Sequence, residues 1–386
     1  MRRKNMEIRI GLVGAGWMGK AHTNAFVNAL MAFGPEAGKP VFELVSDVSE
    51  QAAQAACEKL GFSRWTKDWR TVVTDKNVDV VDIATPNAFH YEIAKAALEN
   101  GKHVYCEKPL TLSYKESKEL AVLAKEKGVV NYVGFNNVMN PATHYIKELI
   151  SSEKLGEIMR FSGTYDQDML LDPNLPITWR HINKLSGSGV LGDLGTHLLS
   201  VSHFLLGNIE SVNAVTKTFI KQRPSAPGST EMQKVENEDF LTVIANYENG
   251  AIGTLSTSRV ATGRKNYLAF EIQGTKGTVH YSLERLNEVN VYFTSDESMN
   301  RGFRTVYLGP DHRGYSTFNP APGINISFND IKILEVHELL SAIANGTPYI
   351  CDFEFGARVD QTVSAILTSA AEQQWINVNK KEEAIV

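Results

Sequence analysis

Six residues near the N-terminus have the composition of a phosphate-binding turn. Gly14-Ala15-Gly16-Trp17-Met18-Gly19 directly follows the apolar stretch Ile8–Val13 and opens a helical pattern. In such a loop the first glycine permits a tight turn, the second lets the backbone approach a pyrophosphate, and the third lets the helix pack on the strand. The N–H groups of the helix N-terminus then face the phosphates. The pattern predicts a dinucleotide site, and a glycine-rich turn without a ligand is the alternative.

An acidic residue at the end of the second predicted strand bears on which dinucleotide binds. Asp47 follows the apolar stretch Val41–Ser46 and stands 47 − 19 = 28 residues after Gly19, a spacing that the loop Met31–Pro40 lengthens. A carboxylate at this place accepts hydrogen bonds from the adenosine ribose and repels a 2′-phosphate. Asp47 therefore favours NAD over NADP, unless it merely caps the helix that follows.

Three further groups of residues carry side chains of the kinds that take part in the oxidation of an alcohol. They are Ala84-Thr85-Pro86-Asn87-Ala88-Phe89-His90, Glu107-Lys108-Pro109 and Gly192-Asp193-Leu194-Gly195-Thr196-His197. The reaction needs a hydride acceptor, a group that takes the hydroxyl proton and a means of holding the oxygen. Lys108 can donate to the reacting oxygen. Asp193 and His197 are four residues apart, so on a helix they share one face, where the carboxylate can orient the imidazole. The alternatives are a solvated lysine and a buried histidine with a structural role.

The first third of the chain alternates strands and helices, which predicts the elements that position these groups. We expect buried strands at 8–13, 41–46, 78–83, 103–106 and 129–133, and helices at 21–30, 50–60, 91–100 and 114–127. This alternation is typical of βαβ units with a parallel sheet covered on both faces. The carboxyl ends of such strands are where open α/β sheets bind ligands, and Thr85 and Lys108 follow two of them.

Beyond Phe135 the pattern changes. A helix is expected from Pro141, then consecutive alternating strands at 158–165, 209–219, 240–247, 251–258, 268–273, 278–281 and 289–293, and two closing helices at about 329–344 and 356–374. Consecutive strands predict a large, mostly antiparallel sheet. We therefore expect an N-terminal Rossmann dinucleotide-binding domain over residues 1–136 (α/β). An α+β domain for substrate binding and oligomerisation is expected over residues 137–386.

The composition is that of an ordinary globular protein. The 386 residues include 39 Lys+Arg and 44 Asp+Glu, for a net charge of −5, and 43% are hydrophobic. Mild acidity gives no reason to expect a nucleic-acid partner, and no apolar run approaches the ~20 residues of a membrane span. The basic start Met1–Lys4 superficially resembles a leader, but Glu7 and Arg9 interrupt the apolar part. The three scattered cysteines favour a reducing, cytoplasmic location, and no residues have the spacing of metal ligands.

Taken together, these motifs resemble those of the Gfo/Idh/MocA family of sugar and cyclitol oxidoreductases. Thr164–Asp168, Trp179-Arg180, Gly187-Ser188-Gly189 and Arg301–Tyr307 are most similar to the branch with levoglucosan and inositol dehydrogenases. The segment Asn137–Asn140 departs from the family, whose members commonly carry an arginine there, and this weakens any transfer of substrate identity.

The resemblance implies a role for each site residue. Lys108, Asp193 and His197 would be catalytic, with His197 as the proton acceptor. The implied cofactor contacts are Gly14, Gly16, Trp17, Met18, Gly19, Asp47, Thr85, Pro86, Asn87, His90, Glu107 and Lys108. The implied substrate contacts are Lys108, Tyr165, Gln167, Trp179, Arg180, Asp193 and His197, with Asp168 nearby; Tyr165 to Arg180 could equally be packing residues.

The expected function is oxidation of a secondary ring hydroxyl of a pyranose, anhydrosugar, glycoside or cyclitol, giving a 3-keto product from a sugar. Two alternatives stay open: redox-assisted glycoside cleavage or sugar-to-sugar hydride exchange with tightly held NAD, and a non-catalytic sugar or NAD sensor. The open face of the antiparallel sheet needs a cover, so we also expect a homo-oligomer, a tetramer or a dimer.

Overall fold

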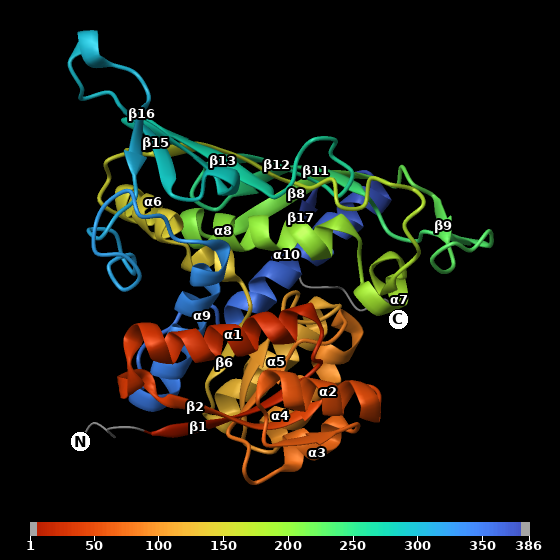
Figure 1. Cartoon of the computed structure of the whole chain (residues 1–386). Helices are drawn as coiled ribbons and strands as arrows, with labels where there is room; N and C mark the ends of the chain where they lie inside the picture. The colour runs from red at the N-terminus through yellow and green to blue at the C-terminus, as the bar shows by residue number, and fades with distance from the viewer. Residues whose placement is uncertain (1–5, 380–386) are drawn as a thin grey trace. The chain divides into compact units, whose positions relative to one another are not determined.

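The computed structural model describes residues 6–379, which form two compact units (Figure 1). The first unit holds the chain up to Asn140 together with residues 314–320 and 326–357. The second holds residues 141–313 and 321–325 and the chain from Arg358 onward.

The first unit is built on a six-stranded parallel sheet in the described part of the chain. Its order is β3-β2-β1-β4-β5-β6, with strands β1 (Glu7–Val13), β2 (Lys39–Ser46), β3 (Arg64–Thr66), β4 (Val80–Ile83), β5 (His103–Cys106) and β6 (Asn131–Val133). This is the strand order of a doubly wound Rossmann sheet, in which the ligand crevice opens between β1 and β4. The predicted fold of this half is confirmed.

Helices connect these strands, and local sequence explains where they begin and end. They are α1 (Trp17–Phe33), α2 (Glu50–Leu60), α3 (Trp69–Thr74), α4 (His90–Glu99) and α5 (Tyr114–Lys127). The side chains of Ser49 and Ser113 accept backbone N–H bonds at the starts of α2 and α5, and Gly61 and Gly128 end the same helices in the left-handed conformation. The sequence reading omitted α3 and the short, exposed edge strand β3.

Helix α9 (Phe328–Asn345) belongs to the first unit, although it lies late in the sequence. A capping box between Ser327 and Asp330 starts it, and it packs beside α1. The observed units therefore differ from the division expected at residues 136 and 137. The first boundary falls at Asn140, but the chain later returns to cover the parallel sheet. A linear reading of element types cannot reveal such a return.

The second unit contains a nine-stranded sheet within the described residues. Its order is β16-β15-β14-β13-β7-β12-β11-β8-β17, with β7 (Ile158–Asp166), β8 (Ile209–Lys217), β11 (Phe240–Tyr247), β12 (Ile252–Ser258), β13 (Tyr267–Gly274), β14 (Gly277–Ser282), β15 (Glu288–Phe293), β16 (Arg304–Tyr307) and β17 (Ile376–Asn377). The pair β7–β12 is parallel, and the other neighbours are antiparallel. The predicted large, mostly antiparallel sheet is confirmed.

Helices and a small ribbon complete the second unit. They are α6 (Pro141–Ser151), α7 (Asn183–Ser186), α8 (Thr196–Leu206), most of α10 (Phe353–Glu372) and the ribbon β9 (Gln222–Pro224) with β10 (Met232–Lys234). The turn before α8, η5 (Leu191–Gly195), is a π-helix rather than the α-helical start that the sequence suggested. Across residues 6–379, no helix combines the length and apolar character needed to cross a bilayer.

Candidate functional site

The glycine loop of the first unit has the geometry that its sequence predicts. Gly14 has a φ of 92°, and a Cβ there would lie 2.7 Å from the carbonyl oxygen of Ala84. A Cβ on Gly19 would lie 2.2 Å from the carbonyl oxygen of Gly14. A Cβ on Gly16, which stands at the start of α1, would meet no described atom within 4 Å. The first and third glycines are thus required by close packing, and the second leaves open space beside the helix N-terminus.

Asp47 follows β2 and is tied to this loop. Its Oδ2 accepts a hydrogen bond of 3.0 Å from the backbone N–H of Ala15, and its Oδ1 accepts one of 2.7 Å from that of Val48. The cap of α2 is Ser49, which accepts from the N–H of Ala52. The alternative that Asp47 only caps this helix is therefore wrong. The carboxylate is half-buried beside the loop, at the position where a ribose is bound in a Rossmann fold.

The ends of β4 and β5 carry the next predicted residues. Thr85, Pro86 and the buried Asn87 follow β4, and the buried Oγ1 of Thr85 has no hydrogen-bond partner among the described residues. Buried hydroxyls are normally hydrogen-bonded, so this one is available to a ligand. After β5, the half-buried Lys108 precedes Pro109 across a cis peptide bond.

His90 differs from its expected role as a cofactor contact. It is fully buried, its Nδ1 lies 2.9 Å from the carbonyl oxygen of Pro109, and its Nε2 lies 3.0 Å from that of Thr85. Burial lowers the pKa of this imidazole. Both ring nitrogens thus lie against protein carbonyls that follow β4 and β5, and neither is presented to a ligand.

Glu107 also turns inward. It is 6% exposed, and its Oε1 lies 2.9 Å from both His22 Nε2 and Lys332 Nζ. Burial opposes ionisation, but the charge of Lys332 and the hydrogen bond from His22 hold the pKa of Glu107 well below its usual range. The carboxylate is thus committed to a buried ionic cluster, which the sequence did not indicate.

The residues of the first unit fit a dinucleotide. The open space at Gly16, the unpartnered hydroxyl of Thr85 and the exposed ring of Trp17, at 72% exposure, lie at or beside loops that leave the carboxyl edge of the parallel sheet. Met18 is half-buried in the first turn of α1. The loop would hold the pyrophosphate and Asp47 the ribose.

In the second unit, the predicted catalytic residues Asp193 and His197 lie on successive turns. Asp193 is in the π-helical turn η5, and His197 is in the first turn of α8. Single π turns within helices are frequent at functional sites. Asp193 Oδ2 lies 3.6 Å from Arg180 Nε, and the ring of His197 meets that of Tyr165 edge-on at a centroid distance of 6.0 Å.

Arg180 and Tyr165, two of the predicted substrate residues, lie beside this pair, and Trp179 packs on Arg180. The guanidinium of Arg180 lies 4.5 Å from the ring centroid of Trp179 in the turn η4 (Trp179–His181). Tyr165 is 4% exposed on β7, and burial, then the nearby Asp193 carboxylate, raises the pKa of its phenol. Aromatic faces, a guanidinium, a carboxylate and an imidazole form a set that suits a polyhydroxylated ring.

Sequence reasoning missed Asn266, which precedes β13. Its Oδ1 accepts hydrogen bonds from Tyr165 Oη at 2.8 Å and from Gln167 Nε2 at 2.9 Å. Asn266 therefore fixes two predicted substrate residues, but an isolated asparagine in a loop gives no signal of such a role. Asp168 forms an ion pair of 2.6 Å with Lys265, whose hydrogen bond and charge lower the pKa of the Asp168 carboxyl.

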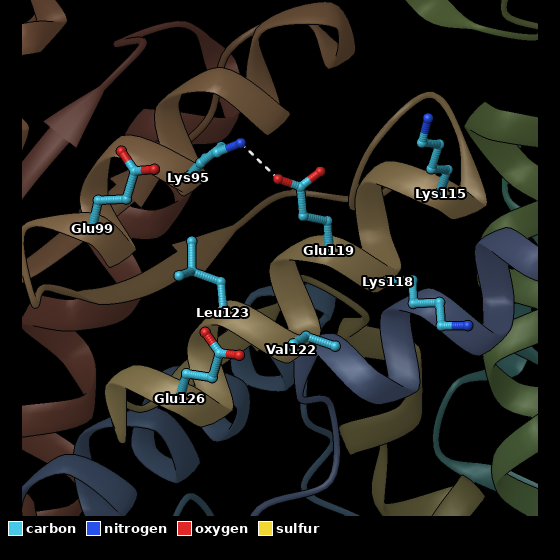
Figure 2. Close-up of a pocket in the computed structure, with 8 residues that line it drawn as sticks. All are labelled: Lys95, Glu99, Lys115, Lys118, Glu119, Val122, Leu123 and Glu126. Atoms are coloured by element: carbon cyan, nitrogen blue, oxygen red, sulfur yellow. Dashed lines mark hydrogen bonds and ion pairs between the residues drawn. The ribbon is translucent and has the colours of Figure 1, made fainter.

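A surface groove lies elsewhere on the first unit, along α4 and α5 (Figure 2). Its lining is Lys95, Glu99, Lys115, Lys118, Glu119, Val122, Leu123 and Glu126, and an ion pair of 2.6 Å joins Lys95 to Glu119. None of the predicted site residues lines it. Among residues 6–379, no three His, Cys, Asp or Glu side chains are grouped to hold a metal ion.

Comparison with known proteins identifies the family. The Oxidoreductase family, NAD-binding Rossmann fold, matches residues 8–135, and the GFO/IDH/MocA C-terminal domain matches residues 143–280. Levoglucosan dehydrogenase of Pseudarthrobacter phenanthrenivorans is 39% identical over 382 residues, which cover 96% of this chain and 98% of the relative. The chain belongs to the Gfo/Idh/MocA oxidoreductase family.

Other members of the Gfo/Idh/MocA family agree with this assignment. A solved levoglucosan dehydrogenase in complex with NADH and levoglucosan has a TM-score of 0.93 and 40% identity, covering 97% of this chain and 100% of that one. The NAD(+)-dependent scyllo-inositol 2-dehydrogenase of Bacillus subtilis is 26% identical over 363 residues, 93% of each chain. The predicted resemblance and the NAD-binding Rossmann domain are thus confirmed, and the chain is an oxidoreductase whose relatives act on CH–OH groups.

Proposed function

We propose that this oxidoreductase transfers a hydride from a secondary ring carbon of a pyranose, anhydrosugar, glycoside or cyclitol to NAD, leaving a ketone. For a pyranose the product would be a 3-keto sugar. The observation that carries the proposal is the clustering of Asp193, His197, Arg180 and Tyr165 in the second unit. The names of the relatives, levoglucosan and inositol dehydrogenases, support the same class of substrate.

NAD is the proposed cofactor in preference to NADP. Asp47 presents its carboxylate beside the glycine loop, where it would accept bonds from a ribose and repel a 2′-phosphate. Val48 and Ser49, which follow, offer no cation to a phosphate.

When bound, the nicotinamide supplies the hydride acceptor. The chain's own residues would handle the proton and the oxygen. The ammonium group of Lys108 would donate to the hydroxyl oxygen and stabilise the negative charge that develops on that oxygen as the O–H bond breaks. The imidazole of His197 would accept the hydroxyl proton, a role in which the base must begin unprotonated.

The remaining residues would position the ring. Asp193 would accept bonds from substrate hydroxyls, and the ion pair with Arg180 restricts its orientation. Tyr165 and Gln167, both held by Asn266, would contact the ring with Trp179. This arrangement orients the substrate before reaction, which lowers the entropic part of the barrier.

A homo-oligomer, a tetramer or a dimer, is part of the proposal. Val215, Ile244 and Ile252 are 65%, 45% and 54% exposed and lie on one face of neighbouring strands β8, β11 and β12. An exposed apolar sheet face of this kind is commonly an interface. Light scattering should give a multiple of the chain's mass, and a monomer's mass would refute the proposed oligomer.

A cytoplasmic location is also proposed, and the three buried free thiols support it.

The test mixes the protein with NAD or NADP and with each member of a panel of pyranoses, glycosides, levoglucosan and inositols. Formation of the reduced nicotinamide is followed by its absorbance. We expect turnover with NAD and at least one panel member, and we expect Lys108→Ala to abolish it. Lys115→Ala, which removes an exposed lysine of α5, is the matched control and should retain full activity. Activity unaffected by Lys108→Ala would refute the mechanism. Mass spectrometry of the product separates simple oxidation, with its substituent intact, from elimination of an aglycone.

A further inference from the structure

Helix α9 buries three charged residues on one side. Lys332, Glu335 and Glu338 are spaced by three residues and are 4%, 0% and 8% exposed. Residues three apart on a helix are neighbours on its surface, so these three form a stripe. Charged side chains are rarely buried unless they are paired, and the stripe therefore needs partners in the first unit.

The partners lie on the parallel sheet. Lys332 Nζ is 2.9 Å from Glu335 Oε1 and 2.9 Å from Glu107 Oε1. The hydroxyl of Tyr105 on β5 donates to Glu335, and that of Tyr132 on β6 donates to Glu338 Oε2 at 2.8 Å. The stripe thus joins α9 to the two strands that flank the Glu107-Lys108 segment.

Glu107 is the centre of the cluster. On its other side, His22 of α1 bridges Glu107 Oε1, at 2.9 Å, and Asp82 Oδ1 of β4, at 2.8 Å. The His22 ring also stacks on Tyr105 at a centroid distance of 4.4 Å. The second oxygen of Glu107 accepts a hydrogen bond of 3.1 Å from the backbone N–H of Lys108. One carboxylate therefore contacts α1 and α9 and holds the peptide that carries Lys108.

The space around this carboxylate is restricted. A Cβ on Gly134, at the end of β6, would lie 2.9 Å from Glu107 Oε1 and 3.3 Å from Lys332 Nζ. The cluster also connects the elements that bear the candidate dinucleotide residues, since α1 follows the glycine loop and β4 precedes Thr85. A change in the charge of Lys332 would therefore be transmitted to the end of β5 through Glu107 and not through a flexible loop.

We propose that Lys332 is a positioning residue for Lys108, acting through Glu107. This inference rests on the proposed function, in which Lys108 contacts the reacting oxygen. Lys332 itself touches neither substrate nor cofactor in this account. Without the Lys332 ammonium group, Glu107 Oε1 loses one of its two short polar contacts, so the carboxylate can shift and weaken the hydrogen bond that its second oxygen accepts from the N–H of Lys108.

The experiment compares Lys332→Met and Lys332→Arg with Leu339→Ala. Leu339 is a fully buried residue of α9 that is not among the charged or hydrogen-bonded residues of the cluster, so its truncation destabilises the same helix without touching Glu107. Thermal midpoint, kcat, KM and the dissociation constant for NADH are measured for each. A misplacement of about 1 Å at a reacting group can cost about 100-fold in rate, so we expect Lys332→Met to lower kcat by about 10- to 100-fold with a smaller change in KM.

Lys332→Arg should recover part of kcat, and Leu339→Ala should lower the thermal midpoint with kcat retained. Equal loss of kcat in Leu339→Ala and Lys332→Met would overturn the proposal, because general destabilisation would then explain both. If Lys332→Met does not fold, Lys332→Gln takes its place. It keeps a hydrogen-bond donor but removes the charge, and an unchanged kcat in that variant would also overturn the proposal.

A second readout does not depend on catalysis. The lysines are reductively methylated with ¹³C, and the resonance of Lys108 is assigned by its absence from Lys108→Ala. Its chemical shift should change in the Lys332 variants and stay constant in Leu339→Ala. An unchanged resonance contradicts the positioning role. If the wild type turns over no sugar, the proposed function fails alone, while this measurement still decides whether Lys332 positions Lys108.

Discussion

Gly16 and Gly19 are three residues apart in the same loop, yet an added methyl group should affect different properties at the two positions. At Gly19 it should lower the stability of the fold, and at Gly16 it should weaken the binding of NAD. At Gly19 the methyl carbon would lie 2.2 Å from a backbone oxygen, which cannot move without shifting the loop. Overpacking of this kind costs about 1–3 kcal/mol, and the better helix propensity of alanine offsets at most about 1 kcal/mol. We therefore expect Gly19→Ala to lower the free energy of unfolding by about 1–2 kcal/mol.

At Gly16 the methyl group would enter open space, and a φ of −66° is accessible to alanine. Its effect on the free energy of unfolding should stay within about 1 kcal/mol, the usual effect of a changed helix cap. The methyl group would, however, occupy the space through which a pyrophosphate approaches the backbone. An overpacking cost of about 1–3 kcal/mol then falls on the complex, and the dissociation constant for NAD should rise by about 5- to 150-fold.

The assay pairs calorimetric titration of each variant with NAD and denaturant unfolding without ligand. Gly16→Ala should bind NAD weakly while its free energy of unfolding stays close to that of the wild type. The main effect of Gly19→Ala should be a lower free energy of unfolding. Wild-type affinity for NAD in Gly16→Ala would refute the assignment of the loop to a pyrophosphate.

Three other predictions follow from single contacts. Burial and the charge of Lys332 act to lower the pKa of His22. The charge of Asp82 and the hydrogen bonds to Asp82 and Glu107 outweigh them and raise this pKa to about 9. Protonation of His22 therefore stabilises the folded state by about 3 kcal/mol, fully below pH ~6.5, and this stabilisation is lost as pH rises through ~9. The unfolding midpoint should fall across this pH window, and His22→Gln should reduce its dependence on pH. Asn266→Ala leaves two donors unpaired and should raise KM for the sugar about tenfold with kcat little changed, as steady-state kinetics would test. Asp47→Ala should reduce the preference for NAD over NADP at least about tenfold, and an unchanged ratio of kcat/KM values would contradict the ribose assignment.

Local pattern predicted the fold and the loops well. Strands such as β5 and helices such as α5 appear at the expected residues because short apolar runs and serine and glycine caps act within a few positions of the chain. The glycine loop follows β1 as its sequence predicts, although the close approach that requires Gly14 comes from Ala84, far along the chain. Apolar runs, caps and glycine spacing are local signals, and a single sequence contains them in full.

The parts that escaped prediction depend on partners distant in sequence. Lys332 and Glu335 have a spacing equally typical of a solvated helix face, so nothing in the sequence indicated a buried stripe against Glu107, 225 residues away. Asn266 is joined to Tyr165 across 101 residues in the same way. Glu107 and His90 were expected to contact the cofactor, but both face inward, because a motif gives the position of a side chain and not its direction.

Transfer of deuterium from a ring carbon to NAD would distinguish a sugar dehydrogenase from a protein that only binds NAD. Wild-type protein is incubated with NAD and pyranoses or cyclitols deuterated at their ring carbons, and the reduced dinucleotide is analysed by mass spectrometry. We expect the wild type to form reduced NAD that carries deuterium from the ring, together with a keto product, and Lys108→Ala to form neither. Reduced NAD without the label, or no reduction across the panel while NAD binds tightly, would contradict the proposed function.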